Sequence, residues 1–176
     1  MAVVGVVITI PEPYNTALTR ARHAAGDPMA GAVPPHVTLL PPTIVEESQF
    51  EEFLGHLDAV ASEHAVFPMR LAGTASFRPV SPVVFVQVAE GRSACESLER
   101  AIRSGPVRRT LDFDYHPHVT IAHHVDDEAL DLAAQDAARF TAEFPVDGFA
   151  LFQQGEDDVW RPLRSFALSE GSRKAE

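Results

Sequence analysis

This sequence has very little cysteine, no long apolar run and no excess of basic charge. Its 176 residues contain one cysteine, Cys95, which cannot form a disulfide bond within the chain. We therefore expect a cytoplasmic protein, since the cytoplasm keeps thiols reduced. No apolar run approaches the roughly 18 residues of a membrane span. The apolar residues 2–10 lack the basic flank and cleavage site of a signal peptide, so they predict a first strand, and no membrane contact is expected.

The balance of charge excludes one further class of protein. The net charge of −11 argues against a protein that coats long nucleic acid, because such binding depends on clustered lysine and arginine. A small phosphate ligand or the end of an RNA needs only a local site and is compatible with this charge. The composition is otherwise that of a globular protein, and the length suits one domain or two small lobes that share a core.

The hydrophobic pattern predicts one order of elements that occurs twice: strand, helix, short strand, helix, strand. In the first half the predicted elements cover residues 2–10, 14–25, 36–40, 46–64 and 66–77. In the second half they cover residues 83–88, 91–104, 118–122, 126–140 and 141–153, and a last strand covers residues 159–168. Irregularities are expected within two strands, near Gly73 and at Asp147-Gly148. The repeated order indicates an internal duplication.

Two lobes that face each other are the natural arrangement for such a duplication. We predict an α+β fold, in which helices pack outside two pseudo-symmetric lobes of mainly antiparallel sheet around a central cleft. A single bilobal domain would span residues 1–169, with lobes of about residues 1–80 and 81–169. Residues 170–176 would form a polar C-terminal tail, and we expect a monomer.

One short motif occurs at the matching point of both halves. The run Pro-His-Val-Thr at residues 35–38 recurs at residues 117–120, and an apolar residue follows it each time. Residues i and i+2 of a strand share one face, so each motif presents an imidazole and a hydroxyl on one side and apolar residues on the other. With the lobes related by a pseudo-two-fold axis, His36 and Thr38 would face His118 and Thr120 across the cleft.

Two opposed imidazoles suit in-line attack at a phosphodiester. Histidine titrates near neutral pH, so one ring can be protonated while the other is neutral. The neutral ring takes a proton from water or a ribose hydroxyl, and the protonated ring gives one to the leaving oxygen. Threonine hydroxyls can donate hydrogen bonds to the non-bridging oxygens, more strongly as charge builds in the transition state. This chemistry needs no metal, and we predict no cofactor.

At these residues the sequence resembles the two-histidine (2H) phosphoesterases, the superfamily of bacterial 2'-5' RNA ligases and cyclic phosphodiesterases. The resemblance rests on the runs His-Val-Thr-Leu at residues 36–39 and His-Val-Thr-Ile at residues 118–121, and it covers about residues 3–168. It implies hydrolysis of 2',3'-cyclic phosphates or related cyclic nucleotides, or reversible 2'-5' ligation of RNA ends. It also implies that His36 is the proton donor, that His118 is the proton acceptor, and that Thr38 and Thr120 bind phosphate.

The sequence departs from the family pattern just after the second motif. Members of the RNA ligase type often have an arginine there, whereas this chain has His123 and His124. Arg78 and Arg161 are the candidates to supply positive charge instead, on position alone. Surface exposure without a ligand is an equally good interpretation of both arginines.

Further binding residues are predicted around the second motif. Tyr115 is the best candidate to stack on a base, since an aromatic face accepts any base; Tyr14 and Phe77 are weaker candidates. His116 shares a face with His118 and is predicted to support it at the cleft. Trp160, in the last predicted strand, is interpreted as core or surface cover.

Two other classes of function stay open at this point. One is a non-catalytic binder of RNA ends or phosphorylated nucleotides on the same fold, which the acidic charge and the absent arginine would suit. The other is a zinc-dependent hydrolase, because imidazoles ligate zinc and four histidines lie close together in the sequence, His116, His118, His123 and His124. The leading hypothesis is the metal-independent phosphoesterase.

Overall fold

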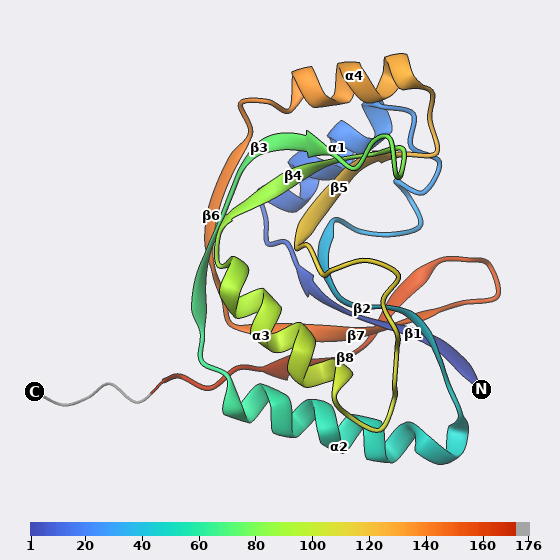
Figure 1. Ribbon diagram of the computed structural model, residues 1–176, viewed down its shortest axis with the longest axis vertical. Helices are drawn as coiled ribbons and strands as arrows, with labels where there is room; N and C mark the ends of the chain where they lie inside the picture. The colour runs from blue at the N-terminus through green and yellow to red at the C-terminus, as the bar shows by residue number, and fades with distance from the viewer. Residues whose placement is uncertain (172–176) are drawn as a thin grey trace, which may run out of the picture.

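Two antiparallel sheets of four strands each form the framework of the protein, in a computed structural model that describes residues 1–171 (Figure 1). The first sheet has the strand order β2-β1-β7-β8 and consists of His36–Val45, Ala2–Thr9, Gly148–Gln154 and Trp160–Ala167. The second has the order β5-β4-β3-β6 and consists of His118–His123, Val83–Glu90, Phe67–Ser76 and Thr141–Val146. The predicted α+β class with antiparallel sheets is confirmed. Residues 172–176 of the predicted polar tail lie outside the described residues.

Four helices pack on the two sheets, at the places in the chain that the apolar pattern predicts. They are α1 (Tyr14–Ala24), α2 (Glu47–Glu63), α3 (Arg92–Arg103) and α4 (Asp127–Asp136). Helices α1 and α4 contact the second sheet, whereas α2 and α3 contact the first; Figure 1 shows α4 and α2 at opposite ends of the molecule. Helix α4 ends four residues before the predicted Phe140. None of the helices among residues 1–171 has the length and apolar character to cross a membrane.

The predicted boundary between lobes, near residue 80, is wrong, because each sheet takes strands from both halves of the chain. Strand β3 of the first half pairs with β4 and β6, while β7 of the second half pairs with β1. The connection between β3 and β4 is only residues 77–82, and a short connection makes consecutive antiparallel strands pair with each other. The first three strands of the two sheets are thus arranged in equivalent order, β2-β1-β7 and β5-β4-β3. The third of these strands comes from the other half of the chain in each sheet.

Two strand boundaries also differ from those predicted. The predicted strand of residues 141–153 is two strands in different sheets, and the expected irregularity at Asp147-Gly148 is the crossing point between them. Strand β2 does not end before Pro41 but continues to Val45. It tolerates two prolines because it lies at a sheet edge, where one side of the strand needs no N–H donors. The irregularity near Gly73 is confirmed: its φ is +78°, and the β3–β4 register shifts between Leu71 and Thr74.

One cluster of buried apolar side chains joins the two sheets. It includes Val6 and Leu39 of the first sheet and Val84 and Val119 of the second, all at most 1% exposed. Strands β2 and β5, which carry the repeated motif, occupy equivalent edge positions of their sheets and contact each other. The fold therefore brings together two segments that are about eighty residues apart in the sequence.

Candidate active site

The two repeated motifs begin strands β2 and β5 and alternate in burial as predicted. Val37 and Val119 are fully buried, while the histidine and the threonine on either side of each valine are only partly buried. The apolar side chains anchor each strand in the core, and the polar ones are left on the opposite face. That face carries His36 and Thr38 on β2, and His118 and Thr120 on β5.

Each motif histidine makes the same hydrogen bond to its own backbone. The Nδ1 atom of His36 lies 2.7 Å from the carbonyl oxygen of Pro34, and that of His118 lies 2.7 Å from the carbonyl oxygen of His116. Because a carbonyl only accepts, Nδ1 must be the protonated donor in both rings. The other ring nitrogen, Nε2, is then free to accept a proton when the ring is neutral and to donate one when it is charged.

Burial shifts the titration of both histidines in the same direction. Loss of hydration lowers the pKa of His36 from 6.5 to about 4, although the Pro34 hydrogen bond opposes the shift; the charges of Arg22 and His118 add to it. Burial also lowers the pKa of His118 from its usual value. In the free protein at pH 7, therefore, both rings are neutral. The two rings stand on β2 and β5, which contact each other.

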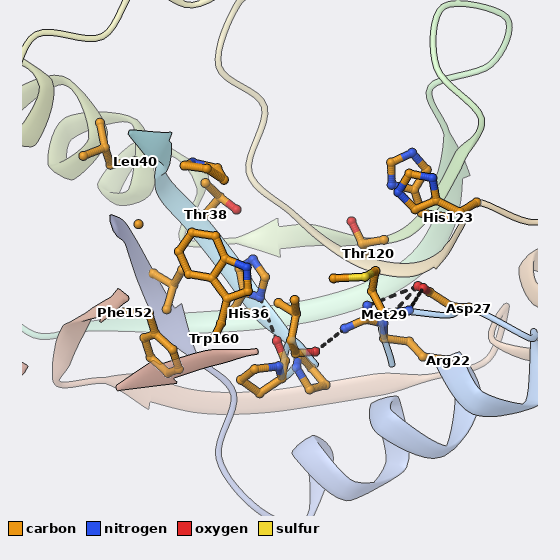
Figure 2. Close-up of a pocket in the computed structure, with 17 residues that line it drawn as sticks. Arg22, Asp27, Met29, His36, Thr38, Leu40, Thr120, His123, Phe152 and Trp160 are labelled. Carbon is orange, nitrogen blue, oxygen red and sulfur yellow. Dashed lines mark hydrogen bonds and ion pairs between the residues drawn. The ribbon is translucent and has the colours of Figure 1, made fainter. Parts of the chain in front are cut away.

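The two histidines nevertheless have different surroundings. His118 lies among aromatic rings, with ring-centre distances of 4.8 Å to Phe77 and 5.1 Å to Phe85. His36 instead lines a cavity of about 330 Å³, together with Thr38 and Thr120 (Figure 2). His118 is not among the residues that line this cavity. Of the motif residues, both threonines therefore line the cavity, but only one of the two histidines does.

One end of the cavity is aromatic. Trp160 and Phe152 line it beside His36 (Figure 2), on adjacent strands β8 and β7. The indole of Trp160 lies over Gly5 of β1: a Cβ added to Gly5 would come within 3.4 Å of the indole ring. The backbone N–H of Trp160 donates to Ala32 O at 3.0 Å, which fixes the start of β8 to the loop before His36. Trp160, which we interpreted as core or surface cover, is therefore a wall of the cavity.

The other end of the cavity is lined by ionisable side chains. His123 and His124 stack at 3.7 Å between ring centres, and the φ of His124 is +58°, which is unusual for a non-glycine residue. Burial lowers the pKa of His123, and the neighbouring His124 adds to the effect. Arg22 and Asp27 lie beside them and form a buried ion pair with 3.1 Å between Nη2 and Oδ2.

The position of Arg22 in the sequence could have indicated a buried ion pair. Leu18, Ala21, Arg22 and Ala25 form the inward-facing stripe of the first predicted helix, and a charged residue on such a stripe needs a partner if it is buried. The partner, Asp27, follows the helix after Gly26, whose φ of +77° reverses the chain direction. Helical spacing alone does not pair Arg22 with Asp27, because Asp27 lies beyond the end of the helix.

The other predicted binding residues lie close to the motifs but are engaged in contacts within the protein. The Tyr115 hydroxyl donates to Thr38 O at 2.8 Å and so ties the segment before β5 to β2. The His116 carbonyl holds the His118 ring, and the His116 side chain packs against Phe77 and Phe85. None of the three residues predicted to contact substrate on these grounds, Tyr115, His116 or Arg78, lines the cavity.

Neither arginine proposed as a substitute charge faces the cavity. The guanidinium of Arg78 lies 2.7 Å from Asp131 and 3.3 Å from Asp127, both on α4. Arg161 pairs with Asp157 at 2.6 Å in the β7–β8 hairpin. The buried Arg22 is the arginine that the fold places at the cavity.

The four clustered histidines of the zinc hypothesis are divided between two places. His116 and His118 lie among the aromatic rings, whereas His123 and His124 stack at the cavity wall. Within residues 1–171, no three histidine, cysteine, aspartate or glutamate side chains are grouped so that they could hold a metal ion.

Comparison with known proteins shows the family to which this chain belongs. A family model described as "2'-5' RNA ligase superfamily" matches residues 10–158. A Bacillus thuringiensis (strain Al Hakam) protein named "Putative phosphoesterase" is 30% identical over 148 residues, which cover 83% of this chain and 86% of the relative.

Solved structures with the same fold cover nearly the whole chain. The crystal structure of TT0787 of Thermus thermophilus aligns with a TM-score of 0.68 at 26% identity, over 97% of this chain and 100% of that one. Escherichia coli LigT complexed with 3'-AMP aligns with a TM-score of 0.63 at 15% identity, over 96% of this chain and 98% of that one. The LigT likeness shows the fold alone, and it confirms the bilobal arrangement.

Proposed function

This chain belongs to the 2'-5' RNA ligase superfamily, and on that premise we propose that it is a phosphoesterase that opens 2',3'-cyclic phosphates by paired-histidine acid-base catalysis. The observation that carries the proposal is the duplicated site: His36 and His118 stand on contacting edge strands, each with Nδ1 bound to its backbone and Nε2 free. Two such nitrogens can act on opposite sides of one phosphorus atom.

The reaction uses one ring as base and the other as acid. His118, neutral, accepts a proton from water through Nε2 as the water oxygen bonds to phosphorus. His36, protonated, donates its Nε2 proton to the ribose oxygen as the phosphorus–oxygen bond to it breaks. The product is a phosphomonoester on one of the two ribose oxygens. With the 5'-hydroxyl of an RNA end in place of water, the same steps with the same roles would join two RNA ends: His118 takes the hydroxyl proton, and His36 protonates the leaving ribose oxygen.

The negative charge of the bound substrate favours the protonated form of His36 that the reaction needs. The free protein holds His36 neutral at pH 7, but a phosphodiester anion beside the ring favours its charged form. A proton bound at a site with so low a pKa is also readily given up to the leaving oxygen. The hydroxyls of Thr38 and Thr120, one from each motif, line the cavity and can donate to the non-bridging oxygens, which carry the growing charge.

The aromatic end of the cavity favours a nucleotide as the substrate. Trp160 presents an indole beside His36, and a base that stacks on an aromatic face gains about 1–3 kcal/mol. The fold neighbour LigT has been crystallised with 3'-AMP, a nucleoside phosphate of the kind that ring opening would produce. Trp160 thus takes the stacking role that we expected of Tyr115.

The test is turnover of 2',3'-cyclic nucleotides in a buffer that contains a chelator. We expect the wild type to release the nucleoside monophosphate, and His36→Ala and His118→Ala each to lower kcat by about 10²- to 10⁴-fold, the usual contribution of one acid-base group. His23→Ala, which removes an exposed histidine of α1, is the matched control and should keep wild-type activity.

Three results would overturn the proposal. Substantial activity in both motif variants would mean that other groups carry the chemistry. Calorimetric binding of cyclic nucleotides by the wild type without any turnover, over pH 5–8, would indicate a binding protein on the same fold. Activity that chelator abolishes and zinc restores would point instead to a metal-dependent enzyme.

A further inference from the structure

We propose that the buried ion pair of Arg22 and Asp27 (Figure 2) is a positioning unit for His36, which it holds through the backbone of Val33 and Pro34. The inference rests on the proposed function insofar as it gives His36 a catalytic role. It goes further, because it assigns a task to two residues that lie outside both motifs.

The pair is unusual in its burial. Arg22 is 5% exposed and Asp27 4% exposed. Arg22 donates to Asp27 Oδ2 from both Nε, at 3.2 Å, and Nη2, at 3.1 Å. Such a pair is costly to desolvate and is often no more stable than two apolar residues of similar volume. Folding stability alone therefore gives no strong reason for its presence at the wall of this cavity.

The remaining arm of the guanidinium points at the loop that carries His36. Nη1 of Arg22 donates to the carbonyl oxygen of Val33 at 2.5 Å. The next carbonyl along the chain, that of Pro34, is the one that accepts from Nδ1 of His36. A shift of the Val33 peptide would move Pro34, and with it the group that sets which nitrogen of His36 faces the substrate.

Asp27 fixes the same loop from its other end. Its Oδ1 accepts from the backbone N–H of Met29 at 2.8 Å, and the carbonyl of Met29 in turn accepts from the N–H of Val33 at 3.0 Å. The ion pair therefore bonds to both ends of residues 29–33. Each of the three arms of the guanidinium and each of the two carboxylate oxygens has a defined partner.

His118 does not need a comparable unit. Its ring is held by contacts with Phe77 and Phe85, whereas no ring contact of that kind involves His36 within the described part of the chain. The open cavity on the other side of His36 leaves the backbone hydrogen bond as its main restraint. A rigid support for that bond thus replaces the packing that His118 has.

The experiment replaces the pair with apolar residues and observes His36 directly. Arg22→Met combined with Asp27→Leu keeps the volume without leaving a lone buried charge, so the variant should fold. Nitrogen-15 NMR of the imidazoles reports the tautomer and the titration of His36, with His36→Gln to assign its signals. We expect the double variant to lose the single Nδ1–H tautomer of the wild type. We also expect kcat to fall by about 10- to 100-fold with a smaller change in KM, as for misplacement of a reacting group.

Two further variants separate positioning from general stability. Arg22→Lys keeps the charge but lacks the planar fork, and should recover part of the kcat lost in the double variant. Arg103→Met combined with Glu99→Leu removes another arginine–carboxylate pair, which lies away from the cavity, and should leave the His36 tautomer and kcat unchanged.

A folded double variant with the wild-type tautomer and kcat would overturn the inference. If the wild type had no phosphoesterase activity, the proposed function would fail, yet the tautomer of His36 in the double variant would still decide whether the ion pair positions the ring.

Discussion

The low pKa of His36 couples the stability of the fold to pH. His36 is neutral in the folded protein down to about pH 4, whereas in the unfolded chain it takes up a proton near pH 6.5. Between these values the unfolded state binds more protons, so lowering the pH favours unfolding. The contribution of His36 to the free energy of unfolding is fully present above pH 6.5 and is lost as the pH falls toward 4. The perturbation that tests this is acidification from pH 7 to pH 5.

The size of the effect follows from the two pKa values. With 6.5 for the unfolded chain and about 4 for the fold, proton uptake by the unfolded state lowers the free energy of unfolding by about 2 kcal/mol at pH 5 and about 3 kcal/mol at pH 4. Burial lowers the pKa of His118, His116 and His123 as well. The wild type should therefore lose more than the share of His36 alone.

Urea unfolding at pH 7 and pH 5 measures the part of this loss of stability that His36 causes. The change in unfolding free energy between the two pH values is measured for the wild type and for His36→Gln, and the difference between the two changes should be about 2 kcal/mol. His23→Gln, an exposed position on α1, is the control and should show the wild-type change. The comparison within each variant cancels any loss of stability that the substitution itself causes.

The reasoning is refuted if His36→Gln destabilises on acidification as much as the wild type does. That result would mean that the imidazole binds its proton equally well in the folded and unfolded states. A direct NMR titration that gave His36 a pKa near its usual value would lead to the same conclusion.

Three further predictions concern catalysis. Because burial lowers the pKa of both motif histidines, kcat/KM for a 2',3'-cyclic nucleotide should peak below about pH 6.5; a pH–rate profile with its maximum above about pH 7.5 would contradict the acid-base assignment. Trp160→Ala should raise KM by about 10-fold with little change in kcat, and steady-state kinetics that show a loss in kcat alone would exclude stacking. Arg78→Met should leave both constants within about twofold, since Asp127 and Asp131 already engage this arginine; a large rise in KM would place it in the substrate site.

Local patterns in the sequence were enough to predict the motif strands. Alternation placed Val37 and Val119 in the core and their polar neighbours on the other face, and the structure confirms it. The same patterns could not predict that β3 joins the second sheet and β7 the first. This arrangement depends on which edges meet when two sheets pack, and the alternation within β3 is the same whichever partner that strand has.

The walls of the cavity were harder to predict than its motifs. Trp160 and Arg22 come from β8 and α1, and each lies more than ninety residues from one of the two motifs. Nothing local distinguishes a tryptophan that lines a cavity from one that covers a core. Arg78 shows the opposite error: its position after β3 suggested a ligand contact, but α4 brings two carboxylates to it.

The unequal surroundings of the two identical motifs support the different roles that we propose for their histidines. Both histidines have the same backbone hydrogen bond, so both present Nε2. Of the two, only His36 lines the cavity, and its burial, with a smaller effect of the Arg22 charge, lowers its pKa to about 4. A ring that holds its proton so weakly is suited to release it to a leaving oxygen once an anionic substrate has brought about protonation. His118, packed among aromatic rings that lower its pKa by burial, is suited to remain neutral and accept the proton of water. The division of roles that we propose thus rests on the residues around the motifs, because the motifs themselves are the same.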